Sequence, residues 1–313
     1  MKMISAEDLK QHLDYASLID AIDQMFKEGC TVPTRHHHPI ETPGAPNPML
    51  LLMPAWVQGD VIGVKIITVF PENGDKDLPA VMGSYMLMDG TNGTPLAMLD
   101  GPELTARRTA SASAVASRYL SRQDSSTILM VGTGVLAPHL IRAHAAARPI
   151  KNVMIWGRDS DKAAAVVAEL ADDDFTCRVV TDLETAVPGA DIISCATLAR
   201  QPLVMGDWLV PGQHLDLVGA FTPEMRESDD RCVVRADLYC DTRDGATLHA
   251  GDFTDPIGRG IISDKDVLGD LFDLTGGRCK GRTGNDQITL FKSAGTALED
   301  LAAAKLAVSR LDN

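Results

Sequence analysis

With 313 residues, the chain is longer than one hydrophobic core usually supports, which predicts two domains. Hydrophobic residues make up 45% of the sequence and charged residues 23%, values typical of a folded globular protein and not of a disordered one. The formal net charge of −14 argues against a nucleic-acid partner, because the chain has no surplus of cations to replace phosphate counterions.

The sequence also argues against a membrane or secreted protein. No window approaches the uninterrupted apolar length that spans a bilayer, and the start of the chain resembles an amphipathic helix more than a signal or transit peptide. The 6 cysteines are scattered without C-x-x-C spacing, as expected of reduced thiols in a cytoplasmic protein. The run His36–His38 suggests a metal, but neighbouring side chains on an extended chain point to opposite faces, so we expect none.

The first part of the chain predicts a helix followed by an antiparallel sheet. Residues 5–28 have the apolar spacing of one helix, with Ser5 as its N-cap. Apolar runs between about residues 47 and 100 are typical of four strands, and DGTNGT between the last two is a strong hairpin signal. A long helix rich in Ala and Ser follows at 101–121.

From residue 126 the pattern changes to alternating strands and helices. Strand-like runs such as STILMVG, NVMIWG and HLDLVGA are separated by helical segments, including 135–148 and 160–171. This alternation predicts a doubly wound sheet of parallel strands, the Rossmann class. The segment 288–311 predicts a short strand and a long helix, which we expect to return to the first domain.

We therefore expect an α/β protein with two domains. The first is an α+β substrate-binding domain with an antiparallel sheet, at residues 1–120, completed by 292–313. The second is a Rossmann dinucleotide-binding domain at residues 121–291.

A glycine-rich turn follows the first strand of the second domain. The segment MVGTGVLAPH contains Gly132-x-Gly134-x-x-Ala137 between a predicted strand and a predicted helix, which is the context that a dinucleotide site requires. Gly132 allows a tight turn, Gly134 allows the backbone to approach a pyrophosphate, and Ala137 allows close helix packing. The alternative is a turn of purely structural use. The residues expected to bind the cofactor are Gly132, Gly134, Val135, Leu136 and Ala137.

The end of the next strand predicts which cofactor is bound. Enzymes that use NAD usually have a carboxylate there that accepts from the ribose hydroxyls, whereas this strand ends Trp156-Gly157-Arg158. Arg158 suits a 2′-phosphate, so we expect NADPH, with NADH possible. Asp159 could still bind a ribose, and Arg158 could instead be a solvated surface charge.

Cations in the first domain suggest a pocket for an anion. Arg35 follows a Pro-Thr turn, Lys65 lies inside the apolar run GVKIITVF, and Arg107–Arg108 lie early in a predicted helix. A lysine within an apolar strand is costly unless it faces a site or a partner, and guanidinium groups match carboxylates. The structural alternatives are a lysine that protects an edge strand and arginines that are ordinary surface charges.

Motifs in consistent order over nearly the whole chain resemble the ornithine cyclodeaminase/mu-crystallin family. They are VPTR, GVKIITVFPEN, DGTNGTPLAMLDG, LTARRTASASAVA, VGTGVLA, IWGR, GADIISCAT, LDLVGAFTPEMRE and FKSAGTALEDLAAA. The resemblance implies a homodimer whose first domain binds substrate and dimerises. It implies that Arg35, Lys65 and Arg108 lie at the substrate carboxylate and the nicotinamide. It also places Thr197 and Lys292–Ser293 at the nicotinamide pocket.

The resemblance implies a ketimine reductase more than a cyclodeaminase. Ornithine cyclodeaminases have an Asp shortly after the VG strand, where this sequence has Phe221, which cannot accept a proton. We expect Phe221 to form an apolar wall of the substrate pocket; the alternative is core packing.

We therefore expect an NAD(P)H-dependent oxidoreductase acting on C=N bonds, with Lys65, Arg108 and Arg35 as its catalytic residues. The expected reactions are reduction of Δ1-pyrroline-2-carboxylate to L-proline and of Δ1-piperideine-2-carboxylate to L-pipecolate, with NADPH preferred. The alternatives are an alanine or N-alkyl-amino-acid dehydrogenase, an ornithine cyclodeaminase, and a mu-crystallin-like protein that binds NADPH and a small ligand.

Overall fold

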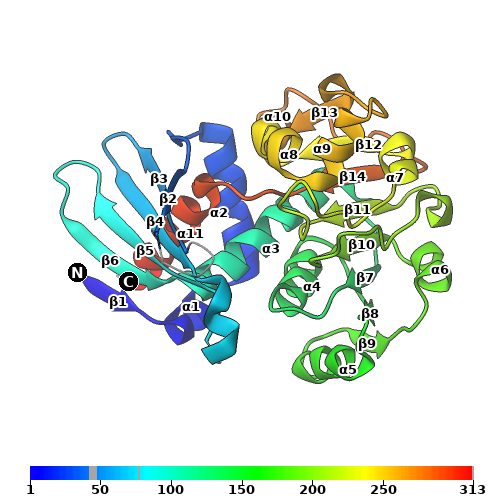
Figure 1. Ribbon diagram of the computed structural model, residues 1–313, viewed down its shortest axis with the longest axis horizontal. Coiled ribbons are helices and arrows are strands. Elements are labelled where there is room, and N and C mark those ends of the chain that lie inside the picture. Colours follow the sequence, from blue (N-terminus) through cyan, green and yellow to red (C-terminus); the bar gives the residue numbers. More distant parts are fainter. Residues whose placement is uncertain (42–47, 77, 312–313) are drawn as a thin grey trace. The chain divides into compact units, whose positions relative to one another are not determined.

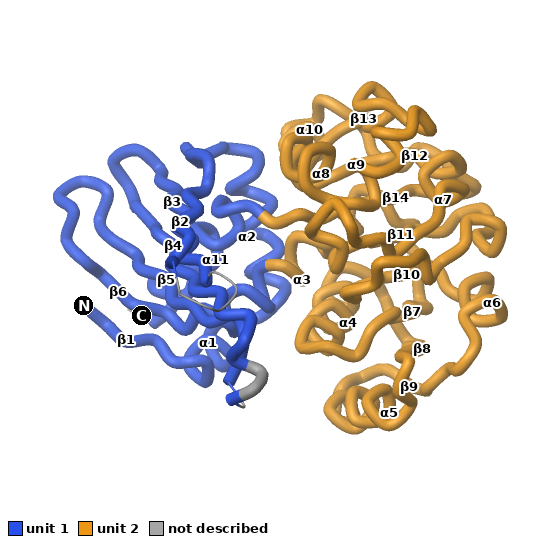
Figure 2. The backbone as a smooth tube through the Cα atoms, viewed as in Figure 1, with its two compact units in different colours: residues 1–108, 296–313 blue, residues 109–295 orange. Residues whose placement is uncertain are grey.

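The computed structural model describes residues 1–41, 48–76 and 78–311. The chain forms two compact units (Figure 2), of which unit 1 comprises Met1–Arg108 and Thr296–Asn313 and unit 2 comprises Thr109–Gly295. The first boundary lies inside helix α3 (Gly101–Leu120), earlier than the boundary after residue 120 that the sequence suggested. One uninterrupted helix continues from unit 1 into unit 2, so no loop marks the boundary in the sequence.

Within the described residues, unit 1 contains a six-stranded sheet of order β1-β6-β5-β4-β3-β2 (Figure 1). The antiparallel strands β3 to β6 and the β5–β6 hairpin confirm the prediction. Two short strands were not predicted: β1 pairs parallel with β6, and β2 pairs antiparallel with β3. The strands are β1 (Lys2–Ile4), β2 (His36–Pro39), β3 (Met49–Val57), β4 (Val61–Val69), β5 (Val81–Asp89) and β6 (Pro95–Asp100).

The helix predicted over residues 5–28 is in fact two helices, α1 (Ala6–His12) and α2 (Tyr15–Glu28). Ser5 caps α1 as predicted, since its hydroxyl accepts from the backbone N–H of Asp8 at 3.2 Å. The prediction of one helix was wrong because Asp14 starts a second helix, where its carboxylate accepts from the backbone N–H of Ser17 at 2.9 Å.

Helix α11 (Ala297–Leu311) belongs to unit 1, where it packs against α2 and one face of the sheet (Figure 1). Val61, Gly63 and Lys65 are the buried residues of β4, and they alternate with half-buried Ile62 and Val64. Because side chains alternate across a strand, one face of the sheet is covered by α11 and the opposite, apolar face has less cover.

Within the described residues, unit 2 contains an eight-stranded parallel sheet of order β13-β12-β14-β11-β10-β7-β8-β9. From β7 the chain runs outward through β8 and β9, and it then returns to β10 and β11 on the other side. This order confirms the predicted doubly wound sheet, and it puts the reversal between β7 and β10. The strands are β7 (Thr127–Val131), β8 (Asn152–Trp156), β9 (Thr176–Val179), β10 (Ile192–Cys195), β11 (His214–Leu217), β12 (Asp237–Cys240), β13 (Val267–Asp270) and β14 (Thr289–Lys292).

Helices connect these strands and cover the sheet, and the core of unit 2 lies between them (Figure 1). The helices are α4 (Leu136–Ala147), α5 (Ser160–Glu169), α6 (Leu183–Ala186), α7 (Asp230–Arg235), α8 (Arg243–His249), α9 (Gly251–Gly258) and α10 (Leu271–Thr275). Short 3-10 helices are η1 (Pro71–Lys76), η2 (Val187–Gly189), η3 (Gly206–Trp208) and η4 (Asp264–Asp266). No helix in the described part of the chain is long and apolar enough to cross a membrane.

Candidate functional site

A pocket of about 990 Å³ lies at the carboxyl ends of the unit 2 strands. Its walls include Gly132–Gly134 after β7, Trp156–Asp159 at the end of β8, and Ala196–Arg200 after β10. Parallel strands bring their carboxyl ends to one edge of a sheet, so three loops distant in the sequence meet there. Doubly wound sheets bind their ligands at this position, where the strand order reverses.

The glycine-rich turn connects β7 directly to α4, the context that the sequence predicts. Gly132 has a φ of 122°, and a Cβ there would lie 2.6 Å from the carbonyl oxygen of Ala196, so only glycine fits. No atom lies within 4 Å of the position that a Cβ on Gly134 would take. The space beside Gly134 is therefore open to a ligand that approaches the backbone closely.

Helix α4 begins immediately after this turn. Val135 is its N-cap and is largely exposed, Leu136 is its first residue, and Ala137 is fully buried. The first backbone N–H groups of a helix have no partner within the helix, and they carry the positive end of its dipole. The start of α4 therefore offers a phosphate the hydrogen-bond donors it requires.

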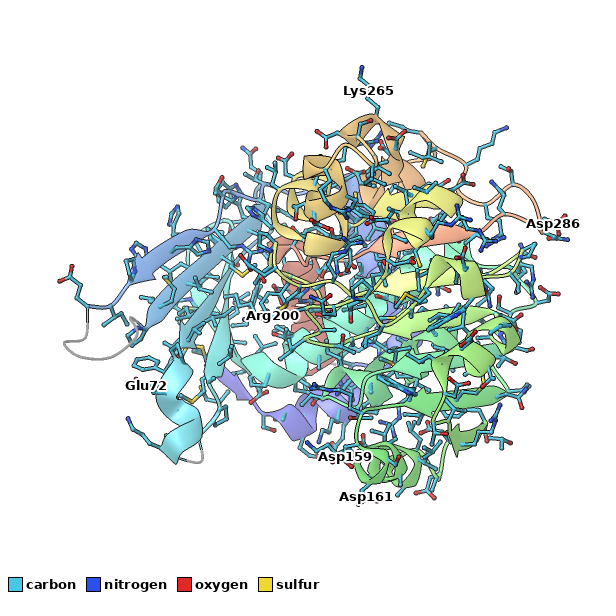
Figure 3. The ribbon with its side chains drawn as sticks, turned by 45° about the vertical axis from the view of Figure 1, so that its right-hand side comes forward. Glu72, Asp159, Asp161, Arg200, Lys265 and Asp286 are labelled. Carbon is cyan, nitrogen blue, oxygen red and sulfur yellow. The ribbon has the colours of Figure 1, made fainter. Side chains whose placement is uncertain are left out.

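The residues at the end of β8 have different surroundings. Asp159 is the N-cap of α5, and its Oδ1 accepts from the backbone N–H groups of Asp161 at 3.0 Å and Lys162 at 3.4 Å. Figure 3 shows Asp159 and Asp161 at the start of α5. The carboxylate is therefore engaged in capping a helix. Arg158 and Lys162 are exposed cations that line the pocket.

The loop after β10 is held by a carboxylate that the sequence did not reveal. Thr197 lines the pocket, and its backbone N–H and hydroxyl donate to Oε1 of Glu227 at 2.6 and 2.8 Å. Glu227 is fully buried. Burial raises the pKa of Glu227 to about 7, against the opposing charge of Lys292.

Three residues assigned from the family resemblance lie outside the lining of this pocket. Lys292 is fully buried at the end of β14, with its Nζ 3.3 Å from Oδ2 of Asp252. Ser293 is also buried, and its backbone N–H donates to the carbonyl of Leu217 at 3.0 Å. Phe221 is 55% exposed, so it is not a core residue. The roles of Phe221 and Ser293 toward a ligand stay predictions.

The second candidate site is a buried cluster of charges in unit 1. Lys65 on β4 and Arg108 on α3 both donate to Oδ1 of Asp300 on α11, from Nζ at 3.0 Å and from Nε at 2.9 Å. Arg108 also donates from Nη1 to Oε2 of Glu299 at 2.5 Å. Both carboxylates are fully buried, so the cluster is held together by charge pairing in a medium of low dielectric constant.

The pKa values of the two buried cations are shifted in opposite directions. It lowers the pKa of the Lys65 ammonium to about 8, with Asp300 opposing the shift and Arg108 adding to it. Burial alone would lower the pKa of the Arg108 guanidinium, but Asp300 and Glu299 outweigh it and leave that pKa raised. The cluster therefore contains a permanent cation beside a cation that titrates slightly above neutral pH.

Two buried polar atoms of this cluster have no hydrogen-bond partner among the described residues: Oδ2 of Asp300 and Oη of Tyr85. Tyr85 on β5 lies directly opposite Lys65 in the register of β4 and β5. Burial, with the nearby charge of Asp300, raises the pKa of the Tyr85 phenol. Leaving a buried polar atom unpaired costs about 1–3 kcal/mol, so these atoms are well suited to meet a polar ligand or water.

The structure separates the other cations from this pair. β4 is an interior strand, so the interpretation of Lys65 as an edge-strand lysine is wrong. Arg107 donates to Glu103 at 2.6 Å and to the carbonyl of Leu13 at 2.8 Å, which is a structural role. Arg35 lies on an exposed segment directly before β2, and its place at the substrate stays a prediction.

The sequence contained a signal for Glu299 and Asp300 that was missed. The segment ALEDLAAA puts two adjacent carboxylates in the first turn of a helix, next to the apolar and buried residues Leu298 and Leu301. Buried carboxylates require cations, and a lysine within an apolar strand requires an anion. Combining the two requirements would have predicted the contact with Lys65.

The three histidines lie exposed on β2. In the part of the chain that the structure describes, no group of three or more His, Cys, Asp or Glu side chains is arranged to hold a metal ion.

Comparison with known proteins identifies the family of the chain. The model of the ornithine cyclodeaminase/mu-crystallin family matches residues 1–313. A Δ1-pyrroline-2-carboxylate reductase of Colwellia psychrerythraea is 36% identical over 99% of this chain and 99% of its own length. The ketimine reductase mu-crystallin of Rattus norvegicus is 31% identical over 97% of this chain and 95% of its own.

A solved structure has the same fold over the whole chain. It is the structure of Thermococcus litoralis Δ1-pyrroline-2-carboxylate reductase in complex with NADH and L-proline. The two structures have a TM-score of 0.91 and 32% sequence identity, and the match covers 99% of this chain and 97% of the other. With the family model matching from end to end, the chain belongs to the ornithine cyclodeaminase/mu-crystallin family.

Proposed function

We propose that this protein is an NADPH-preferring reductase of cyclic α-imino acids, forming L-proline from Δ1-pyrroline-2-carboxylate and L-pipecolate from Δ1-piperideine-2-carboxylate. It is a nicotinamide-dependent oxidoreductase acting on C=N bonds, like the relatives described above. The observation that carries the substrate class is the buried cluster of Lys65, Arg108 and Asp300. A permanent guanidinium beside an ammonium that titrates suits a small molecule with a carboxylate next to a basic nitrogen.

The cofactor proposal is supported by the fit of the pocket to a dinucleotide. Gly134 leaves room at the backbone, and the start of α4 offers donors to a pyrophosphate. When bound, the reduced nicotinamide supplies a hydride to the imine carbon. Arg158 and Lys162 present two cations at the end of β8, and the Asp159 carboxylate is occupied by its helix cap, which together favour NADPH over NADH.

In this proposal, Arg108 orients the substrate. Asp300 and Glu299 fix Nε and Nη1 of its guanidinium, which leaves Nη2 for the substrate carboxylate. A guanidinium held in one orientation positions a bound carboxylate without a further loss of side-chain entropy. Asp300 is a positioning residue, because it holds both cations.

Lys65 supplies the proton. When the imine carbon gains the hydride, the π electron pair of the C=N bond stays on nitrogen, and a proton from Nζ of Lys65 forms the new N–H bond. The resulting neutral amine of Lys65 regains a proton from water. With a pKa of about 8, the ammonium is protonated at neutral pH, and it is a stronger acid than an exposed lysine.

We further propose that the protein is a homodimer. The less covered face of the unit 1 sheet carries half-buried Ile62, Val64 and Ile66 on β4, with Met86 and Met98 on the next two strands. An apolar face of this kind suits a second copy of the chain. Sedimentation should give twice the mass of the chain, and Val64→Asp should shift the protein to a monomer; an unchanged mass would contradict this use of the face.

The function is tested by measuring NADPH oxidation with Δ1-pyrroline-2-carboxylate, beside NADH, and beside pyruvate with ammonia or methylamine. Rapid oxidation with the cyclic imine alone is the expected result. Turnover only with the keto-acid mixtures would make the protein an amino-acid dehydrogenase. Ammonia release from ornithine would restore the cyclodeaminase, and binding of NADPH without any oxidation would indicate a binding protein.

A further inference from the structure

Glu227 joins the loops that follow two adjacent strands of unit 2. Its Oε1 accepts from the backbone N–H and the hydroxyl of Thr197, which follows β10. Its Oε2 accepts from the backbone N–H groups of Gly219 at 2.7 Å and Ala220 at 3.3 Å, which follow β11. One buried carboxylate therefore fixes the carboxyl ends of both strands.

The backbone around Glu227 also supports the pocket wall. The carbonyl of Ala199 accepts from the N–H of Arg226 at 2.9 Å, and the carbonyl of Glu227 accepts from the N–H of Leu203 at 2.9 Å. Ala199 and Leu203 both line the pocket. The segment that contains Glu227 therefore runs directly behind the wall formed by the loop after β10.

The contact between the two loops leaves no room for adjustment. A Cβ on Gly219 would lie 2.1 Å from the carbonyl oxygen of Thr197 and 2.6 Å from Oε1 of Glu227. The loops thus approach as closely as their backbones allow. The position of Thr197 and the course of the segment that leads to Phe221 are set together.

The hydrogen-bond donors around Glu227 suit an ionised carboxylate, whereas burial and the like charge of Asp252 raise its pKa. The described contacts to its two oxygens all come from N–H or O–H donors. Asp252 accepts from the backbone N–H of Glu227 at 2.9 Å, and it is itself paired with Lys292 at 3.3 Å and lies 3.9 Å from Nε of Arg226. The charge of Lys292 favours the ionised form of Glu227 and opposes that rise, and both oxygens of Glu227 bind the loops.

The three walls of the pocket correspond to different parts of a dinucleotide. In doubly wound sheets, the glycine turn binds the pyrophosphate, and the end of the second strand binds the ribose of the adenosine half. These parts are Gly132–Gly134 and Trp156–Asp159 in this protein. The remaining wall, Ala196–Arg200 after β10, is left for the nicotinamide half.

We propose that Glu227 is a positioning residue for the nicotinamide half of the cofactor, acting through Thr197 and Gly219. The inference rests on the proposed use of a nicotinamide dinucleotide. Glu227 contributes no atom to the lining of the pocket. It fixes the wall against which the ring lies, so its loss weakens the binding of that half and leaves the adenosine half unaffected.

The test compares Glu227→Gln with Asp191→Asn. The Gln amide keeps the size of the side chain but puts an N–H₂ group against the N–H donors that the carboxylate now accepts from. Asp191 is a matched control because its Oδ2 also accepts from backbone N–H groups, those of Ser126 at 2.7 Å and Thr127 at 2.9 Å. These contacts lie at the amino ends of the strands, away from the pocket. Calorimetry measures the Kd of NADPH and of adenosine 2′,5′-bisphosphate, which contains only the adenosine half.

Glu227→Gln should raise the Kd of NADPH roughly tenfold, which is the size of effect expected when hydrogen bonds to a buried charge are lost. It should leave the Kd of the bisphosphate unchanged. Asp191→Asn should change neither Kd, although both variants should unfold at a lower temperature. Equal weakening of the two ligands by Glu227→Gln, or no weakening of NADPH, would overturn the proposal and leave Glu227 a purely structural residue.

A second variant covers the case in which Glu227→Gln does not fold. Thr197→Val removes the hydroxyl that donates to Glu227 at 2.8 Å and accepts from the backbone N–H of Ala199 at 3.3 Å. It should raise the Kd of NADPH about threefold without changing that of the bisphosphate; an unchanged NADPH Kd would contradict the proposal. A wild-type protein that binds neither NADPH nor NADH would instead contradict the proposed function. If the wild-type protein binds only NADH, 5′-AMP replaces the bisphosphate as the probe.

Discussion

The two sites use charge in opposite ways. In unit 1, Lys65 and Arg108 are buried and are already paired with Asp300 and Glu299. In unit 2, the pocket lies beside the glycine-rich turn, and the cation at the end of β8, Arg158, is exposed. A buried ion pair is costly to break, whereas an exposed charge is screened by water. We therefore expect substitutions in the buried cluster of unit 1 to have large effects. Single substitutions at the exposed cation of unit 2 should instead change the preference for one cofactor over the other.

Arg108→Met should have the largest effect. It leaves two buried carboxylates without their guanidinium, which costs about 3–5 kcal/mol of unfolding free energy. Loss of the proposed contact with the substrate carboxylate should lower kcat/KM roughly 1,000-fold. Denaturant unfolding and steady-state kinetics measure the two effects separately.

Arg107→Met is the matched control for that variant. Arg107 is nearly as buried, pairs with Glu103, and has its guanidinium 5.2 Å from the centre of the Tyr15 ring. The Arg107→Met variant should be less stable than the wild-type protein but have the same kcat/KM. A similar loss of activity in both variants would mean that Arg108 acts only through the fold.

Lys65→Met should lower kcat about 100-fold, because it removes the group that we propose protonates the imine nitrogen. Lys65→Arg keeps a cation but cannot release a proton near neutral pH. Compared with Lys65→Met, it should therefore bind the substrate more tightly but have a kcat that is still low. The measurement is kcat and KM for all three proteins. Wild-type turnover in Lys65→Met would remove the proposed role.

The pKa of Lys65 predicts two pH effects. In the wild-type protein, kcat/KM should fall as pH rises through about 8, because the ammonium loses the proton that it donates in the proposed reaction. The pKa in the folded state is below the ordinary value of 10.5, so the folded protein releases this proton first, and the contribution of Lys65 to stability rises with pH from about 8 to 10.5. Both effects should be absent in Lys65→Met.

Arg158→Ala should have a smaller and more selective effect. Removing one exposed cation should raise the KM for NADPH about tenfold, on the scale of a hydrogen bond to a charged group, and leave the KM for NADH unchanged. Lys151→Ala is the control, because Lys151 is an exposed cation directly before β8, at the opposite end of the same strand. An equal rise for both cofactors would show that Arg158 does not read the 2′-phosphate.

Asp159→Ala should have the smallest effect, a loss of about 1 kcal/mol from the missing helix cap. Because Asp159 is engaged with the start of α5, the KM for NADH should not change. A marked rise in that KM would assign the carboxylate to the ribose and weaken the preference for NADPH.

Local patterns in the sequence predicted most of unit 2 and the family. The central strands β7 and β10 are buried apolar runs, and the glycine turn lies between a strand and a helix, so the signals are contained in short segments. The short strands β1 and β2 were missed because they lack a run of buried residues. The break between α1 and α2 was missed because Asp14 also fits the surface of a longer helix.

The partners of the site residues could not be predicted in the same way. Lys65 was singled out because a charge within an apolar strand needs an explanation, but Asp300 lies 235 positions away. Glu227 occurs in the segment TPEMRE, where nothing distinguishes it from a surface acid. Its role depends on how the loops after β10 and β11 meet, which only the tertiary structure establishes.

The position of α11 in the sequence also has a consequence for biosynthesis. Unit 2 is continuous in the sequence, so all of it leaves the ribosome before α11 does. Until α11 is synthesised, Lys65 and Arg108 lack the carboxylates that neutralise them when they are buried, and β4 lacks the helix that covers it. We therefore expect unit 2 to fold first, while the strands made earlier wait in contact with water and chaperones. The strands synthesised first are then among the last to become protected from proteolysis.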